Sequence, residues 1–155
     1  MKKNKQFVFF LILLTCVAFD QITKIFIDNT LYLNQNLVIL KNVLSFEKLY
    51  NSGAAFSIMQ NNTLLLILIS VITVFFILIF ILKKTAKLSI YNTCALAFIS
   101  GGAIGNLIDR IFNSYVIDFI QLDFINFPVF NFADIFINIG VIILVVSIFI
   151  CKNNE

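Results

Sequence analysis

Two aspartates, Asp118 and Asp134, are the residues in this sequence most suited to acid–base catalysis. Each lies in an apolar segment, and the two are 16 residues apart. Two carboxyl groups that meet cannot both ionise easily, so they share a proton. The ionised group can then take a proton from water while the protonated group polarises a peptide carbonyl. Such a pair hydrolyses peptide bonds without Ser, Cys, His or metal, although the spacing alone does not show that the two side chains meet.

Further polar residues recur at a spacing of four within apolar segments. Asp20 and Lys24 form one such pair, and Asn106 and Arg110 form another. Residues four apart lie on one face of a helix, and charges inside a membrane span are costly and often functional. Each pair also has a plain explanation, as a structural ion pair or as an anchor at a helix end. Their convergence at one depth is what favours a functional site.

Two polar residues, Asn131 and Asp134, lie at the start of the last apolar segment. Asn131 suits a helix N-cap, and Asp134 would then lie in the first turn, near the positive end of the helix dipole. That position by itself explains an acid at Asp134 in most proteins. Asp118 is harder to explain, because no local residue pairs with it. We therefore expect Asp118 to be buried by the protein or to dip toward the membrane.

The composition predicts a membrane protein that positions these residues. Hydrophobic residues make up 61% of the 155 residues, charged residues make up 12%, and the mean hydropathy is +1.02. The net charge of +3 is too small to indicate a nucleic-acid partner. Histidine, the commonest general base and transition-metal ligand, is absent. The three cysteines lack the spacing of a zinc site, and we interpret them as thiols buried in the membrane.

Four apolar segments are long enough to cross a bilayer, which takes about 20 residues in a helix. They span residues 7–27, 64–82, 88–108 and 132–151 of a single domain, 1–155. The first could be a cleaved signal peptide, but its apolar pattern continues past Cys16, so we expect a retained helix. Seven basic residues indicate that both termini are cytoplasmic, because all seven fall on one side of four alternating spans. These residues are Lys2, Lys3, Lys5, Lys83, Lys84, Lys87 and Lys152.

The fold class expected is therefore a membrane all-α protein with four transmembrane helices and a small β-sheet and loop subdomain on its outer face. The outer loops would cover residues 28–63 and 109–131. Within the first loop, residues 37–40 and 43–50 favour short strands, separated by asparagine-rich turns. The pairing of these strands cannot be derived from the sequence.

At these residues the sequence resembles the lipoprotein signal peptidase family, also called signal peptidase II. The resemblance covers nearly the whole chain and keeps the family's motifs in order. The matching segments are Asp20–Lys24, Asn51–Ser57, Gly101–Arg110, Val116–Phe119 and Phe127–Asp134. One departure is Ser114, where relatives often have glycine, and it could alter a turn.

The resemblance implies that Asp118 and Asp134 are the catalytic dyad of an intramembrane aspartyl endopeptidase. Its substrate would be a bacterial prolipoprotein, cut just before a diacylglyceryl-modified cysteine in the plasma (inner) membrane, with the active site toward the outer face. The family uses no metal or other cofactor and is blocked by the cyclic peptide globomycin. The surrounding polar shell that binds substrate would be Asp20, Lys24, Asn51, Gly53, Asn106, Arg110 and Asn131.

Two other classes of membrane protein also place acids near a membrane surface. A magnesium-dependent lipid phosphotransferase could use Asp109, Arg110 and Asp118, but the sequence lacks the closely spaced set of four acids that such sites need. A small transporter or proton relay would place acids along a path through the membrane. The inner half of the predicted spans contains none, apart from Glu155 at the tail.

Overall fold

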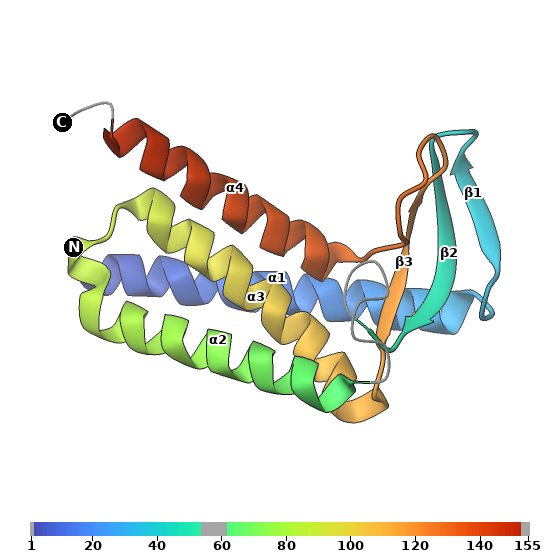
Figure 1. Ribbon diagram of the computed structural model, residues 1–155, viewed down its shortest axis with the longest axis horizontal. Coiled ribbons are helices and arrows are strands. Elements are labelled where there is room, and N and C mark those ends of the chain that lie inside the picture. The colour runs from blue at the N-terminus through green and yellow to red at the C-terminus, as the bar shows by residue number, and fades with distance from the viewer. Residues whose placement is uncertain (1, 54–61, 153–155) are drawn as a thin grey trace.

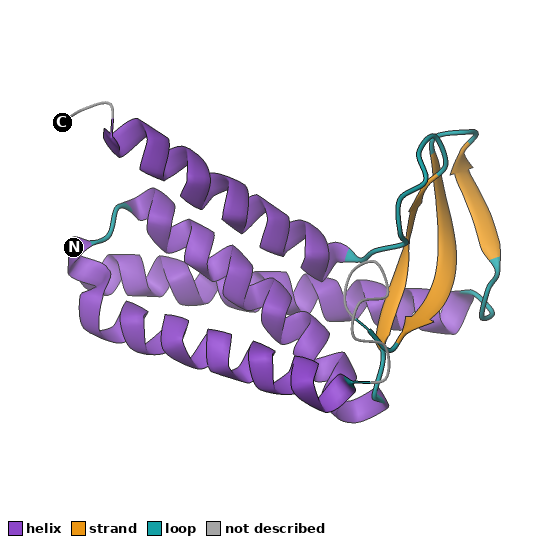
Figure 2. Cartoon of the chain, viewed as in Figure 1, coloured by secondary structure: helices purple, strands orange, loops and turns teal. Residues whose placement is uncertain are grey.

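A computed structural model describes residues 2–53 and 62–152 of the chain. Within them the chain is mostly helical, with a small sheet formed by its two long loops (Figures 1 and 2). The helices and strands are α1 (Lys2–Thr30), β1 (Asn36–Leu40), β2 (Leu44–Asn51), α2 (Thr63–Lys84), the 3-10 turn η2 (Thr85–Lys87), α3 (Ile90–Asn113), β3 (Val116–Leu122) and α4 (Phe132–Lys152).

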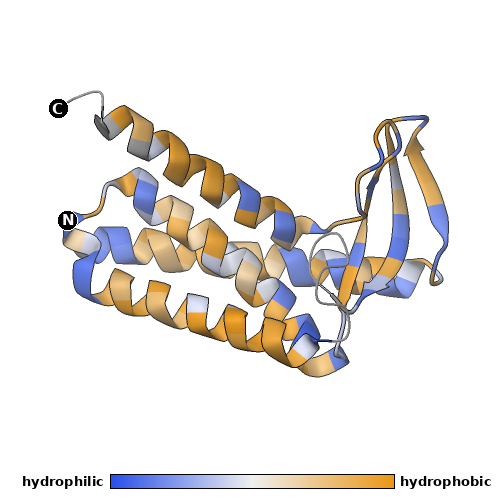
Figure 3. Ribbon diagram, in the orientation of Figure 1, coloured by the Kyte–Doolittle hydropathy of each residue, from blue (hydrophilic) through white to orange (hydrophobic). Residues whose placement is uncertain are grey.

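Helices α1, α2 and α3 have the length and composition of membrane spans. By these two criteria, three stretches could each cross a bilayer, Lys3–Thr30, Thr63–Lys87 and Ile90–Asn113, and α4 adds a shorter apolar stretch over Phe132–Ser147. Hydropathy colouring shows α2 as apolar along most of its length (Figure 3). Two lysines in the last turn of α2 complement the negative end of the helix dipole. The expectation of a mostly helical membrane protein with a small sheet is confirmed.

Helix α3 is the central element, because it packs against α1, α2 and α4. Gly102 permits the approach of α4: a Cβ atom there would collide with the backbone carbonyl of Ala133 and with the side chain of Ile137. Successive helices run in alternating directions (Figure 1). The first turn of α1 and the last turn of α4 therefore lie at one end of the bundle, and the sheet lies at the other.

The sheet has the order β1-β2-β3 and is antiparallel throughout. Strands β1 and β2 coincide with the two strands expected in the first loop, whereas β3, from the second loop, was not predicted. Its burial explains the miss, since residues Val116 to Ile120 are all buried and show no alternation of polar and apolar residues. A register shift in β2 between Phe46 and Leu49 brings Leu49 opposite Asp118.

Ser114 ends α3 in the left-handed conformation, with φ of 68°. Its backbone N–H donates to the carbonyl of Arg110, which closes the helix. Glycine adopts this conformation most easily, so the departure from the family's pattern falls at a position where the backbone geometry suits glycine. The turn is nevertheless made.

Two of the three cysteines are described, and both are free thiols: Cys16 is buried and Cys94 is half-buried. The side chain of Cys151 lies outside the described part of the chain.

Candidate active site

Asp118 is held on β3 by two amide side chains. Asn51 lies at the end of β2 opposite Val116, so it is the diagonal neighbour of Asp118 on the same face of the sheet. Its Nδ2 donates to Oδ2 of Asp118 at 2.8 Å, and Nδ2 of Asn131 donates to Oδ1 at 2.6 Å. Both side-chain oxygens of Asp118 thus accept a hydrogen bond although only 3% of the residue is exposed.

Asp134 is held by the N-terminus of its own helix. The N–H of Asp134 donates to Oδ1 of Asn131 at 3.1 Å, and the N–H of Asn131 donates back to Oδ2 of Asp134 at 3.2 Å. This reciprocal pair is a capping box, which fits the N-cap expected at Asn131. The other oxygen of Asp134 accepts from Nδ2 of Asn106 at 2.8 Å. Asp134 is half-buried and so is the more accessible of the two acids.

Asn131 joins the two aspartates. Its side chain bonds Asp118, while its backbone N–H and its Oδ1 bond Asp134. Oδ1 of Asn106 also accepts from Nδ2 of Asn131 at 3.1 Å. Both dyad candidates therefore bond one fully buried asparagine, and each of their four carboxylate oxygens accepts from an amide N–H.

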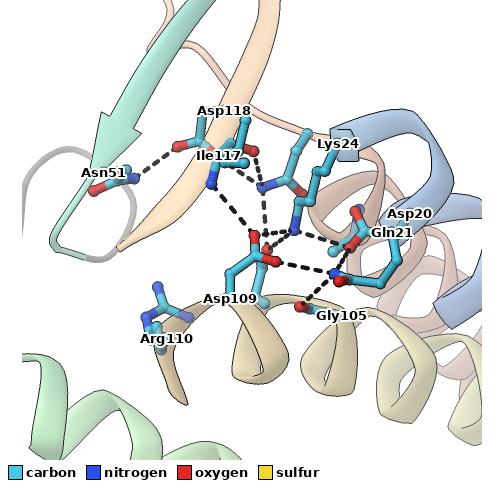
Figure 4. A network of polar contacts seen from close by, with 12 residues as sticks. Asp20, Gln21, Lys24, Asn51, Gly105, Asp109, Arg110, Ile117 and Asp118 are labelled. Carbon is cyan, nitrogen blue, oxygen red and sulfur yellow. Dashed lines mark hydrogen bonds and ion pairs between the residues drawn. The ribbon is translucent and has the colours of Figure 1, made fainter. Parts of the chain in front are cut away.

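A buried ion cluster lies near Asp118 (Figure 4). Nζ of Lys24 contacts Oδ2 of Asp20 at 2.9 Å and Oδ2 of Asp109 at 2.8 Å, and it donates to Oδ1 of Asn106 at 2.9 Å. Gln21 bridges the two acids, at 3.2 Å from Asp20 and 3.0 Å from Asp109. The Asp20 and Lys24 pair expected from helical spacing is present and extends to α3.

Asp109 and Gln21 were not among the predicted site residues. Asp109 was assigned to an outer loop, but α3 continues to Asn113 and carries it inward. Its spacing of three from Asn106 was a usable signal, because residues three apart share a helix face. Gln21 had no such signal, and only the packing of α1 on α3 reveals its contacts.

Arg110 connects α3 to the loop after β2. Its Nη2 donates to the carbonyl of Gly53 at 2.9 Å, and the N–H of Gly53 donates to Oδ1 of Asn51 at 2.9 Å. The turn at Gly53 thereby orients Asn51 toward Asp118. The rest of the motif that begins at Asn51, residues 54–57, lies outside the described residues. All nine site residues expected from the sequence are thus gathered where the sheet meets the helix ends.

Burial, and then the nearby charge of Asp134, raise the pKa of Asp118 to about 7, from an ordinary value of 3.8. The hydrogen bonds from Asn51 and Asn131 oppose this rise because they favour the carboxylate. Asp118 can therefore hold or release a proton near neutral pH. Among the described residues there is no group of three or more His, Cys, Asp or Glu side chains that could hold a metal ion. Two neighbouring acids, one of them protonated near neutrality, can act as acid and base on a peptide bond.

A family model and individual relatives of known sequence both match this chain, and they name the same family. The family model for signal peptidase (SPase) II matches residues 12–150. A lipoprotein signal peptidase of Listeria welshimeri is 39% identical over 144 residues, which cover 92% of this chain and 93% of the relative. One of Streptococcus pyogenes serotype M5 is 40% identical over 146 residues, covering 94% of each.

Two solved structures share the fold. Both are described as bacterial membrane enzymes solved by the in meso method, at 2.3 Å and 1.9 Å resolution. The first has a TM-score of 0.88 and 28% identity, covering 95% of this chain and 90% of the other. The second has a TM-score of 0.81 and 29% identity, covering 90% of this chain and 91% of the other.

Proposed function

The chain belongs to the signal peptidase II family, and from that premise we propose that Asp118 and Asp134 are the catalytic dyad of this protease. The protein removes signal peptides from prolipoproteins, cleaving before the lipid-modified cysteine. The main support for this dyad is the contact that Asn131 makes with both acids. Its side chain donates to Asp118, and its backbone N–H donates to Asp134. This asparagine joins a strand and a helix that come from separate parts of the fold.

The proposed reaction uses the dyad with one shared proton. The ionised carboxylate takes a proton from water, and the resulting hydroxide attacks the scissile carbonyl. The protonated carboxyl donates its hydrogen bond to the carbonyl oxygen and later supplies the proton that the departing amine needs. Asp134 is half-buried whereas Asp118 is buried, so water reaches the pair from the side of Asp134. The proton belongs to the pair, and neither acid is assigned a fixed role.

Asp20 and Lys24 of the polar shell belong to the buried ion cluster, and the other five residues of the shell separate into two parts by their contacts. Asn51, Asn106 and Asn131 bond the dyad directly and orient its four oxygens. Arg110 and Gly53 form the side of the site that a substrate backbone meets, since Arg110 is only half-buried and the one hydrogen bond described for its side chain goes to Gly53. The cyclic peptide globomycin would bind this same side, in competition with the substrate.

The proposed topology has four spans, with both chain ends in the cytoplasm. Six of the seven lysines used to predict the orientation lie in the first turn of α1 and the last turns of α2 and α4, which share one end of the bundle (Figure 1). The seventh, Lys87, lies in η2, which follows α2. The dyad and the sheet lie at the other end, toward the outer face of the bacterial plasma membrane. A signal peptide crosses the membrane as a helix, so its cleavage site would meet the dyad while the diacylglyceryl chains stay in the lipid.

The dyad is tested by two single variants, Asp118→Asn and Asp134→Asn, assayed for cleavage of a lipid-modified prolipoprotein in detergent. Each should abolish turnover, because an amide can neither accept the water proton nor release one. Asp123→Asn is the matched control, since the described contacts of the Asp123 side chain are limited to a hydrogen bond from Ser45, at the far end of the sheet. Far-UV circular dichroism verifies folding. Robust turnover by either folded dyad variant would overturn the assignment.

A further inference from the structure

Two acids outside the dyad hold the backbone next to each member of the dyad. Oδ1 of Asp20, on α1, accepts from the backbone N–H of Ala133 at 2.9 Å, and Ala133 precedes Asp134. Oδ2 of Asp109, on α3, accepts from the backbone N–H of Ile117 at 3.3 Å, and Ile117 precedes Asp118. The same arrangement therefore occurs twice, once at the head of α4 and once on β3.

Lys24 ties these two acids together. Its ammonium contacts Oδ2 of both acids and Oδ1 of Asn106, so its three N–H donors have three acceptors. Only 1% of Lys24 is exposed. A charge buried this deeply is stable only when it is fully paired, and a change in one partner is felt by the others. The distance between the two acids, and with it the spacing of the two backbone segments, therefore depends on this ammonium group and on the Gln21 amide, which bridges the same two acids.

The third contact of Lys24 orients Asn106, which is hydrogen-bonded to the dyad. Oδ1 of Asn106 accepts from Lys24 and from Asn131, so the amide nitrogen of Asn106 must face the other way. There it donates to Asp134. Lys24 thus determines which end of the Asn106 amide meets the dyad, although it touches neither catalytic acid.

Helices α1, α3 and α4 pack closely around Gly105, next to the ion cluster. A Cβ atom at Gly105 would lie 2.5 Å from Oδ2 of Asp20 and 3.3 Å from the Cβ of Ala133. Such a contact would displace the Asp20 carboxylate from the backbone N–H that it holds. The glycine on α3 is therefore matched to the acid on α1 and to the start of α4.

We propose that Asp20, Lys24 and Asp109 are positioning residues that set the separation of the two catalytic carboxyl groups. This inference rests on the dyad proposed above. None of the three residues touches substrate; they act on the backbone beside Asp118 and Asp134. Because a misplacement of about 1 Å in an active site can lower turnover by about 100-fold, loss of one backbone contact should reduce kcat and leave substrate binding nearly unchanged.

Two variants of Asp109 separate positioning from stabilisation. Asp109→Ala removes both the ion pair with Lys24 and the acceptor for the Ile117 N–H. Asp109→Asn also removes the charge, but its carbonyl oxygen still accepts from Ile117. We expect kcat to fall at least tenfold in Asp109→Ala, with KM within about twofold, and to recover to within about fivefold of the unchanged protein in Asp109→Asn. The control Asp123→Ala should leave both constants unchanged.

The measurement uses the full chain, a lipid-modified prolipoprotein, and rates normalised to folded protein. A purely stabilising role predicts lower thermal stability in both Asp109 variants with kcat per folded enzyme unchanged, and that result overturns the proposal. If Asp109→Ala does not fold, Gly105→Ala probes the other arm and should lower kcat without raising KM; a kcat within twofold overturns the proposal equally. Asp118→Asn is run in parallel, since its activity would refute the dyad whatever the Asp109 variants show.

Discussion

Replacing Asp118 by asparagine should stabilise the protein at neutral and alkaline pH while it destroys activity. Burial beside Asp134 raises the pKa of Asp118 from 3.8 to about 7. The folded state therefore binds this proton more tightly than the unfolded state. As pH rises from about 4 to about 7, the folded protein must give up a proton that the unfolded chain has already lost, so the free energy of unfolding decreases across that window.

The magnitude follows from the size of the shift. A difference of about 3 pKa units corresponds to roughly 4 kcal/mol at 1.36 kcal/mol per unit. This is an upper limit, fully present above about pH 7 and absent below about pH 4. The variant also suffers a constant loss of about 1–3 kcal/mol, because its new NH2 group faces an amide donor, from Asn51 or Asn131. The stability difference between variant and unchanged protein should therefore rise with pH and then level off.

The assay is reversible unfolding in mixed micelles between pH 4 and pH 8.5, followed by far-UV circular dichroism because the chain has no tryptophan. Asp118→Leu is the matched control. It removes the same titration but also removes all hydrogen bonding, so its difference curve should have the same slope with a different offset. A difference that stays flat or falls across this range in both variants would refute the raised pKa of Asp118 and the buried-acid reasoning behind it.

Four further outcomes are expected. Ser114→Gly should raise the free energy of unfolding by about 1 kcal/mol, because the position has a φ of 68°; micelle unfolding measures it, and a loss of stability would contradict this. Lys48→Met should lower the same quantity by about 1–3 kcal/mol, since its ammonium caps the carbonyls of Asp28 and Leu31 at the end of α1. In a pH–rate profile, kcat should decline above about pH 7 as the dyad loses its shared proton; an alkaline limb beginning above pH 9 would argue against it. EDTA should leave turnover unchanged, whereas a lipid phosphotransferase that needs magnesium would be inhibited.

The buried cluster behind the dyad explains why so polar a site survives at the end of apolar helices. Each charge in it has a partner: Lys24 meets two carboxylates, and Gln21 donates to both. Removing one partner leaves an unpaired charge in a dry environment, which costs far more than the pair contributes. A single substitution at any of these charged residues should therefore lower the stability of the fold.

The features that depend on neighbouring residues could be read from the sequence. Runs of about 20 apolar residues predict helices long enough to cross a bilayer, since length and composition decide this locally. The N-cap at Asn131 and the first-turn position of Asp134 follow from the backbone chemistry of a single helix terminus. The gathering of polar residues at one depth follows from counting residues along each apolar segment.

The contacts that make the site depended on tertiary structure. The pairing of β3 with β2 places Asn51 diagonally across from Asp118, and this pairing joins segments 67 residues apart through a register that no local pattern encodes. The apolar pattern of the sequence places Asp109 in a loop, whereas α3 extends to Asn113 and turns Asp109 toward Lys24. A residue's partners across space are set by how helices pack and strands align, and the spacing of residues along the chain does not contain that information.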